Sequence, residues 1–251
     1  MLLSPKDHLV MHNYGLLGKT LGHSFSKAFF ENYFSENNIA AVYSNFELTD
    51  IVEIESVFEQ NISGLNVTIP YKELAIPFLD ELSEEARLIG AVNVIQFKNG
   101  KRIGHNTDAF GFHQSIKPFL TNMHERAILL GTGGASKAVE FVFKSIGLDV
   151  IHISRNPSGN KQFSYSEVNE HMVKACKVIV NCTPLGTFPK IDECVDFPFQ
   201  FLTKDHLVVD LIYNPKKTKF LEQAQHYDAT ILNGESMLRE QALKSWEIWN
   251  S

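Results

Sequence analysis

The feature that most constrains the fold of this chain is a glycine-rich turn between a predicted strand and a predicted helix. In AILLGTGGASKAVE (127–140) an apolar run reaches Gly131, Gly133 and Gly134 follow, and a helical pattern begins directly afterwards. Glycine permits a tight turn, and a helix N-terminus offers unpaired N–H groups and a partial positive charge. This context is typical of dinucleotide-binding folds, although Ser136 stands where a third glycine is usual. The alternative is a glycine-rich turn that binds no ligand.

Strand-like and helix-like patterns alternate on both sides of this turn. Before it, helical patterns separate three strand-like runs, at 13–18, 41–48 and 64–69. After it come three more strand-like runs, at 148–154, 175–183 and 206–214. This order predicts an α/β protein in which helices cover parallel sheets, and Asn99-Gly100 predicts a tight hairpin. A break near 108–125 divides the pattern into two α/β units, which we expect to be two domains that face a ligand cleft.

Composition excludes several classes of protein. A net charge of −6 and a pI near 5.9 argue against general nucleic-acid binding, which requires a clustered basic surface. No apolar stretch reaches the roughly 20 residues that span a bilayer, and the N-terminus lacks a secretory pattern. The three cysteines show no metal-ligand spacing, and so sparse a count fits a reducing cytosol. We therefore expect a cytoplasmic protein. It should contain no metal and should bind neither nucleic acid nor membranes.

The strand after the glycine-rich turn indicates which dinucleotide is preferred. NAD sites usually carry an acidic residue there, which accepts a hydrogen bond from the ribose 2′-hydroxyl. Here the strand ends in HISRNPS, with Ser154 and Arg155 and without an acid. The planar, permanently charged guanidinium of arginine suits a 2′-phosphate, so the sequence favours NADP over NAD. The alternative is that Arg155 is a solvated residue at the end of a strand.

Taken together, short motifs along the whole chain resemble the shikimate dehydrogenase family. One of them, GLNVTIPYK, places an amide, a hydroxyl and an amine at the end of an apolar strand. The nine stretches occur in the family's order: YGLLGKTLGHSFSK (14–27), GLNVTIPYK (64–72), IGAVNVI (89–95), HNTDAFGF (105–112), GTGGASKAV (131–139), ISRNP (153–157), NCTPLGT (181–187), DLIYNPKKTKFL (210–221) and NGESMLREQA (233–242). The resemblance implies an oxidoreductase that reduces 3-dehydroshikimate to shikimate with NADPH, in the pathway to chorismate and the aromatic amino acids.

The resemblance implies that Lys72 and Asp108 are the catalytic pair. Reduction of a ketone requires hydride at carbon and a proton at oxygen, and a cationic amine beside the carbonyl can donate that proton. In the oxidative direction the neutral amine can take the proton back. A nearby carboxylate favours the charged amine and orients it. Taken alone, Lys72 would more often be an exposed lysine after a proline turn.

The resemblance also implies the residues that bind a small, polyhydroxylated, carboxylated ring. Ser24 and Ser26 would hold the carboxylate with Tyr213 nearby, although both serines could simply cap a helix. Asn66 and Asn93 could instead have a structural role, with side chains that form hydrogen bonds to the backbone. The complete expected set is Ser24, Ser26, Asn66, Thr68, Lys72, Asn93, Asp108, Tyr213 and Gln241.

For the cofactor, the resemblance points to the turn, to the next strand end and to three later positions. The turn at the pyrophosphate would comprise Gly131, Thr132, Gly133, Gly134 and Ala135. Ser154, Arg155 and Asn156 would surround the 2′-phosphate, where the family commonly has N-R-T, so the first and third positions depart. Leu211 and Gly234 would lie near the nicotinamide, and Thr183 near the cofactor.

The implied architecture is an N-terminal α/β substrate domain and a Rossmann-like, doubly wound NADP-binding domain with a cleft between them. We expect the substrate domain at 1–107, with the C-terminal helix 235–251 packed back on it because Gln241 should touch substrate. The NADP domain should span 108–234. Two other functions stay open: a quinate/shikimate dehydrogenase with broader substrates or NAD, and a non-catalytic nucleotide-binding sensor. We expect a monomer or a homodimer.

Overall fold

The computed structural model describes residues 11–22 and 24–251, which form two compact units. Of the described residues, the first unit contains 11–22, 24–87, 91–106 and 245–251, and the second contains 88–90 and 107–244. Residues 1–10 of the expected first domain lie outside the described residues. Of the expected C-terminal helix 235–251, residues 235–244 belong to the second unit and 245–251 to the first; the domain boundaries stay a prediction.

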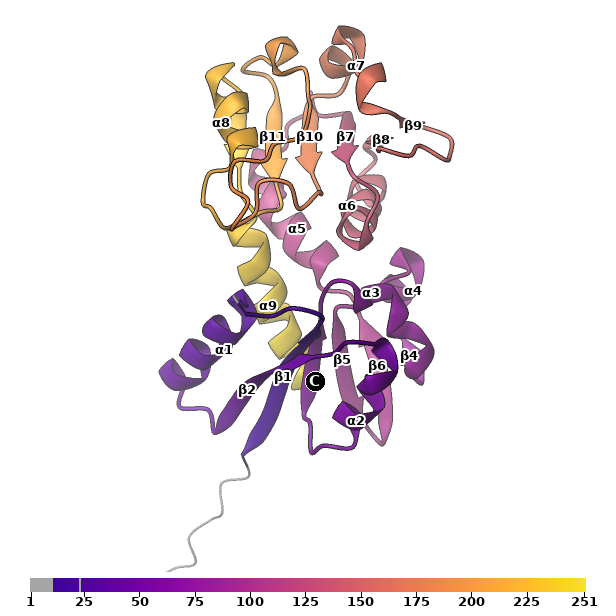
Figure 1. Ribbon diagram of the computed structural model, residues 1–251, viewed down its shortest axis with the longest axis vertical. Coiled ribbons are helices and arrows are strands. Elements are labelled where there is room, and N and C mark those ends of the chain that lie inside the picture. Colours follow the sequence, from indigo (N-terminus) through magenta and orange to yellow (C-terminus); the bar gives the residue numbers. More distant parts are fainter. Residues whose placement is uncertain (1–10, 23) are drawn as a thin grey trace, which may run out of the picture. The chain divides into compact units, whose positions relative to one another are not determined.

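The first unit contains a mixed sheet with the strand order β2-β1-β3-β5-β6-β4 (Figure 1). Strand β1 is parallel to β2 and β3, whereas β5 is antiparallel to β3 and β6. The predicted hairpin is confirmed, with Asn99 and Gly100 at φ 54° and 74° between β5 and β6. The strands are β1 (His12–Gly18), β2 (Ala41–Glu47), β3 (Gly64–Val67), β4 (Glu81–Leu82), β5 (Val94–Lys98) and β6 (Lys101–His105).

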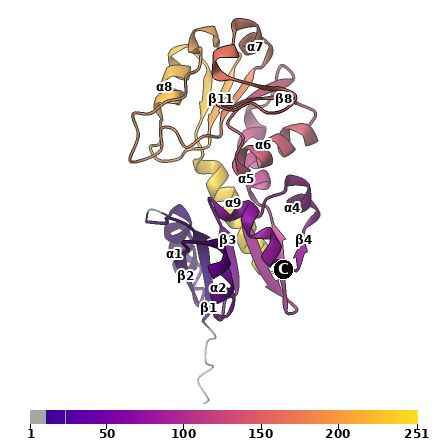
Figure 2. The same ribbon diagram turned by 45° about the vertical axis from the view of Figure 1, so that its right-hand side comes forward.

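Short helices connect these strands. The helical segment between β2 and β3 consists of a 3-10 turn and α2, and Asp50 caps the turn through a reciprocal contact with Glu53. The longer α1 lies beside β2 (Figures 1 and 2). The helices are α1 (Phe25–Glu36), α2 (Ile54–Phe58), α3 (Tyr71–Leu74) and α4 (Glu84–Ile89), with 3-10 turns at Ile51–Glu53 and Ile76–Phe78.

The last seven residues complete an aromatic cluster of the first unit. They include the end of α9 (Glu235–Trp249), where Trp249 stacks on Tyr14 at 4.8 Å between ring centroids and lies 5.3 Å from Phe30. The Trp249 indole N–H donates to the Ile95 carbonyl at 3.1 Å. A Cβ at Gly64 would lie 2.4 Å from the same indole, so glycine is required there for close packing.

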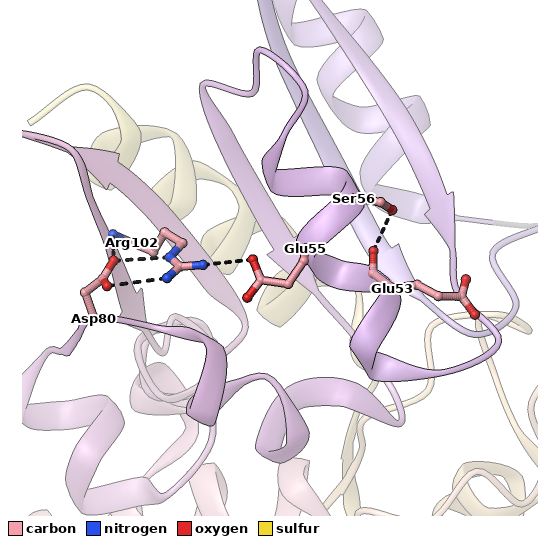
Figure 3. Close-up of polar contacts among 5 residues, drawn as sticks. All are labelled: Glu53, Glu55, Ser56, Asp80 and Arg102. Carbon is pink, nitrogen blue, oxygen red and sulfur yellow. Dashed lines mark hydrogen bonds and ion pairs between the residues drawn. The ribbon is translucent and has the colours of Figure 1, made fainter.

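Arg102 joins three segments at the far edge of this sheet (Figure 3). Its Nε lies 3.2 Å from Asp80 Oδ2, its Nη2 3.4 Å from Asp80 Oδ1, and its Nη1 3.2 Å from Glu55 Oε2. The guanidinium carbon also lies 5.0 Å from the centre of the Phe58 ring. Beside Arg102, the pKa of Asp80 is lowered, chiefly by the side-chain hydrogen bond from the guanidinium. The cluster ties β6 and the segment before β4 to α2.

We expect Arg102→Lys to destabilise the protein by about 1 kcal/mol, because lysine cannot form the forked contact with Asp80 or stack its planar group on Phe58. The loss should be visible in urea unfolding followed by circular dichroism, and should shrink at high salt. The matched control is Lys101→Ala, which removes an exposed ion pair with Glu81. An equal loss in both variants would contradict a special role for the Arg102 cluster.

The second unit contains a six-stranded sheet in which every recorded pair is parallel. Its order, β12-β11-β10-β7-β8-β9, places the first strand in the centre and winds outward in both directions. This is the doubly wound order of dinucleotide-binding folds, as we predicted. The strands are β7 (Arg126–Leu130), β8 (Asp149–Ile153), β9 (Gln162–Phe163), β10 (Val178–Asn181), β11 (Leu207–Asp210) and β12 (Thr230–Leu232).

Helices of the second unit pack around this sheet. Residues of β7, β10 and β11 are almost wholly buried, which explains their uninterrupted apolar sequences. Helix α5 packs on α6 through Phe112 and Phe143, whose ring centroids are 5.3 Å apart. Within 11–22 and 24–251, no helix combines the length and apolar character that crossing a membrane requires. The remaining helices are α5 (Asp108–Ile116), α6 (Gly134–Ser145), α7 (Glu170–Ala175) and α8 (Lys219–His226).

Candidate active site

The glycine-rich turn lies between β7 and α6, as its sequence predicts. Gly131 has φ 102°, a conformation that side chains disfavour, and a Cβ there would lie 3.1 Å from the Thr183 methyl. At Gly133, which caps α6, a Cβ would meet none of the described heavy atoms within 4 Å. Packing therefore explains Gly131 but not Gly133, and the open space at the helix N-terminus is what a bound pyrophosphate, which stays a prediction, would require.

Ser136 takes over the position of the missing third glycine. It is 1% exposed, and its hydroxyl donates to the Gly131 carbonyl at 2.9 Å. This hydrogen bond connects the first turn of α6 to the start of the glycine-rich turn. Behind it, His152 Nδ1 lies 3.4 Å from Ser136 Oγ and His152 Nε2 lies 3.2 Å from Glu140 Oε2. Serine, histidine and carboxylate contact one another in the same order as in a hydrolytic triad. They cannot act as one, because the buried Ser136 hydroxyl has no access to a substrate. Their role is to support the turn.

The predicted 2′-phosphate segment follows β8 directly. Since Ile153 pairs with Leu130 in the parallel sheet, this segment begins at the same edge as the glycine-rich turn. Arg155 is exposed, and Ser154 Oγ accepts a hydrogen bond from the Asn156 N–H at 3.2 Å. Lys161, a second basic residue nearby, pairs instead with Asp149 at the start of β8. Of the two basic residues in this loop, Arg155 is therefore the one that lies at the carboxyl end of β8.

A buried polar network joins the carboxyl ends of β10 and β11. Asp210 is 0% exposed, and its Oδ1 accepts from Asn181 Nδ2 and from the Ile212 N–H, both at 3.1 Å. Its Oδ2 accepts from Thr218 Oγ1 at 2.5 Å. Burial raises the pKa of Asp210 to about 6, although all three hydrogen bonds oppose the rise.

The same network reaches the predicted cofactor positions in this unit. Asn181 Oδ1 accepts from the N–H and the hydroxyl of Thr183, at 3.0 and 2.7 Å. The Leu211 N–H donates to the Asn181 carbonyl at 3.1 Å. A Cβ at Gly234 would lie 2.1 Å from the Leu211 carbonyl oxygen, so only glycine fits there. The structure thus gathers Thr183, Leu211 and Gly234, which we expected near the cofactor.

In the first unit, the side chain of Asn66, one of the expected substrate residues, forms hydrogen bonds with other residues of the protein. It is buried, and its Oδ1 accepts from the Tyr43 hydroxyl at 2.7 Å. Its Nδ2 donates to the Asn93 carbonyl at 3.3 Å and to Ser245 Oγ at 3.0 Å. In this structure the Asn66 amide therefore has a structural role. Its contact with substrate stays a prediction.

Ser24 and Ser26 lie at the start of α1. Ser24 caps this helix, since its hydroxyl accepts from the Lys27 N–H at 3.3 Å. Ser26 contacts Tyr43: burial raises the pKa of the Tyr43 hydroxyl well above its usual value, and a hydrogen bond with Ser26 opposes the rise. Ser26, Tyr43 and Asn66 therefore form one connected group. Thr68 continues β3 by donating its N–H to the Leu17 carbonyl at 2.8 Å.

The expected catalytic pair belongs to two different units. Lys72 lies half-buried in α3 of the first unit, where its carbonyl accepts from the Val92 N–H at 2.7 Å. Asp108 begins α5 in the second unit and is buried. The approach of the two side chains stays a prediction.

Of the three other expected substrate residues, Asn93 is buried in the first unit, whereas Tyr213 and Gln241 lie in the second. Gln241 on α9 is held against the start of α5, where its Oε1 lies 3.4 Å from Thr107 Oγ1. A Cβ at Gly111 would lie 2.5 Å from the Met237 carbonyl, which explains how closely α5 and α9 pack. Tyr213 follows β11 and is half-buried.

Six polar residues of these networks were not anticipated from sequence: Tyr43, Glu140, His152, Asp210, Thr218 and Ser245. Only Asp210 carried a readable signal. It is a carboxylate at the end of a fully apolar run, LVVD, where an acidic side chain must find hydrogen-bond donors. The other five are common residue types, and nothing in their local sequence indicates which partner each one contacts.

Comparison with known proteins identifies the family. The family model for the shikimate dehydrogenase substrate binding domain matches residues 16–95. A shikimate dehydrogenase (NADP⁺) of Desulforamulus reducens is 36% identical over 257 aligned positions, which cover 94% of this chain and 88% of that protein.

Solved structures agree. The shikimate dehydrogenase of Aquifex aeolicus has a TM-score of 0.84 at 35% identity, over 96% of this chain and 92% of that one. The enzyme of Thermus thermophilus, solved with NADP(H) and shikimate, has a TM-score of 0.83 at 27% identity, over 95% and 93%. Matches over almost the whole chain to dehydrogenases place it in the dehydrogenase class of oxidoreductases. Within that class, the chain belongs to the shikimate dehydrogenase family.

Proposed function

We propose that this chain catalyses the reversible, NADPH-dependent reduction of 3-dehydroshikimate to shikimate, in the cytoplasm and on the route to chorismate and the aromatic amino acids. The observation that carries the proposal is similarity to curated shikimate dehydrogenases along almost the whole chain rather than over the nucleotide fold alone. We infer a substrate domain at 1–107 with helix 235–251, an NADP domain at 108–234, and a monomer or homodimer in solution.

The residues of the second unit fit a dinucleotide. The N-terminus of α6 opens at Gly133 without obstruction from the described residues, which suits a pyrophosphate. Arg155 at the carboxyl end of β8 suits a 2′-phosphate, and no acidic residue accompanies it in the segment 154–156. The Leu211, Gly234 and Thr183 cluster would then face the nicotinamide end. The cofactor supplies hydride when bound; everything else in the reaction falls to side chains.

Lys72 and Asp108 are the proposed proton-transfer pair. In the reductive direction the Lys72 ammonium donates a proton to the ketone oxygen, and in the oxidative direction the neutral amine accepts it from the hydroxyl. The Asp108 carboxylate orients the amine and favours its charged form. Ser24 and Ser26 would bind the substrate carboxylate, and Asn66, Thr68, Asn93, Tyr213 and Gln241 would bind or approach the rest of the ring.

The proposal is tested by following reduction of NADP⁺ and of NAD⁺ with shikimate and with quinate. We expect rapid reduction of NADP⁺ with shikimate and slow reaction in the other three combinations. Equal rates with quinate would make the chain a quinate/shikimate dehydrogenase. Tight NADPH binding without turnover of 3-dehydroshikimate would make it a sensor.

Arg155→Ala should raise the KM for NADP⁺ by about 10- to 100-fold, since a charge-assisted contact to phosphate contributes about 1.5–3 kcal/mol. The KM for NAD⁺, which lacks that phosphate, should hardly change. The matched control is Lys161→Ala, because Lys161 is engaged with Asp149. Equal weakening of both cofactors by Arg155→Ala would contradict the assignment.

A further inference from the structure

The carboxylate of Asp210 has an unusual position for a charged group. It is fully buried, and the three contacts recorded for it come from neutral donors: an amide, a backbone N–H and a hydroxyl. A buried carboxylate without a cationic partner is costly, so its presence here calls for a reason beyond packing. Cys182 and Cys194, the titratable groups whose charges act on or respond to it, are thiols with pKa values raised chiefly by burial, and they supply no counter-charge.

Each donor comes from a different segment. Asn181 ends β10, Ile212 follows β11, and Thr218 caps α8 through a contact from the Leu221 N–H at 3.3 Å. The pairing of β10 with β11 ends at Asn181 and Asp210. Beyond that point, the carboxylate connects the end of β10, the residues after β11 and the start of α8.

The contacts continue outward from these segments to the predicted nicotinamide end. Through Asn181 they reach Thr183, whose hydroxyl in turn accepts from the Leu185 N–H at 3.3 Å. Through Ile212 they reach Gly234, whose N–H donates to the Ile212 carbonyl at 3.0 Å. Leu211 lies directly between Asp210 and Ile212. All of these residues belong to the second unit.

We propose that Asp210 is a positioning residue for hydride transfer, which fixes the Thr183, Leu211 and Gly234 cluster against the nicotinamide end of the cofactor. The inference rests on the proposed function and adds to it a residue that touches neither cofactor nor substrate. The adenosine end, at Arg155, follows β8, and β7 separates β8 from β10 and β11 in the strand order. Loss of the carboxylate should therefore affect the two ends of the cofactor unequally.

Asp210→Asn is the direct variant. An amide has one acceptor oxygen, so its NH₂ group must face one of the donors, and the contact there must break or reverse. Thr218 provides a milder pair: Thr218→Val removes one donor to the carboxylate, whereas Thr218→Ser keeps it. The matched control is Asn169→Ala, which removes the cap of α7 in the same unit at an exposed position.

The measurements are kcat and KM with NADP⁺ and shikimate, calorimetric binding of adenosine 2′,5′-bisphosphate, and NADPH binding by fluorescence. We expect kcat to fall about tenfold or more in Asp210→Asn and about threefold in Thr218→Val, since small misplacements of reacting groups are costly. Thr218→Ser and Asn169→Ala should remain within about twofold of the parent. The affinity for adenosine 2′,5′-bisphosphate should stay within about twofold in every variant.

Two results would overturn the proposal: parental kcat in both Asp210→Asn and Thr218→Val, or loss of adenosine 2′,5′-bisphosphate binding in parallel with kcat. If Asp210→Asn does not fold, the contrast between Thr218→Val and Thr218→Ser decides. If the parent itself fails to oxidise shikimate, the proposed function falls. The positioning role is then decided by whether Thr218→Val and Asp210→Asn weaken NADPH while sparing the bisphosphate fragment.

Discussion

Lys72→Ala should lower kcat for shikimate oxidation by about 10²- to 10⁴-fold, the usual contribution of a positioned general acid–base group. The KM for shikimate should change much less, because the expected hydroxyl and amide contacts to the ring remain. A loss confined to the chemical step is the signature of a group that acts in the transition state. Steady-state kinetics with both substrates varied measures it.

The matched control for this variant is Lys98→Ala. Lys98 ends β5 in the same unit and is exposed, so its removal should leave kcat and KM unchanged. Activity of Lys72→Ala within threefold of the parent would remove Lys72 from the mechanism. A rise in KM without a fall in kcat would instead make it a binding residue.

Trp249→Ala should reduce the free energy of unfolding by about 3–5 kcal/mol, as large-to-small changes of buried aromatic residues do. The indole is 8% exposed, stacks on Tyr14, and donates to the Ile95 carbonyl. Its removal would leave a cavity over Gly64 and an acceptor without its donor. Urea unfolding followed by far-UV circular dichroism measures the loss without relying on tryptophan fluorescence.

Trp249→Phe separates the two contributions of this side chain. Phenylalanine retains most of the buried ring but not the N–H, so we expect a loss of about 1–2 kcal/mol, intermediate between parent and alanine. Asn250→Ala, an exposed neighbour on the same segment, should be nearly neutral. An alanine variant as stable as the parent would show that the aromatic cluster is not needed for the fold.

Long periodic elements could be predicted from sequence because their signal is local. The strand-like run at 148–154 became β8, the glycine-rich turn lies where the alternation placed it, and Asn99-Gly100 forms the hairpin. Two-residue strands such as β4 and β9 were missed, because two residues carry no periodicity. They exist because neighbouring strands offer free edge groups, which is a property of the assembled sheet.

Long-range polar contacts could not be predicted. Asn66 was proposed for substrate from its motif, yet its amide is shared between Tyr43, Asn93 and Ser245, the last 179 residues further along the chain. The contact with Ser245 depends on where the end of α9 packs in the first unit. The hydropathy pattern of the sequence contains no information about that packing. The Asp210 network is similar: its members stand out as polar residues at apolar strand ends, but only coordinates reveal that they meet.

The division of α9 between the two units also bears on the order of folding during synthesis. The first unit holds 11–22, 24–87 and 91–106, yet its aromatic cluster includes Trp246 and Trp249, which are translated only after residues 107–244 of the second unit. The second unit, by contrast, has its full set of residues once Lys244 has emerged. Nascent chains of this protein should therefore complete their nucleotide fold before the first unit, although most of the first unit is translated earlier.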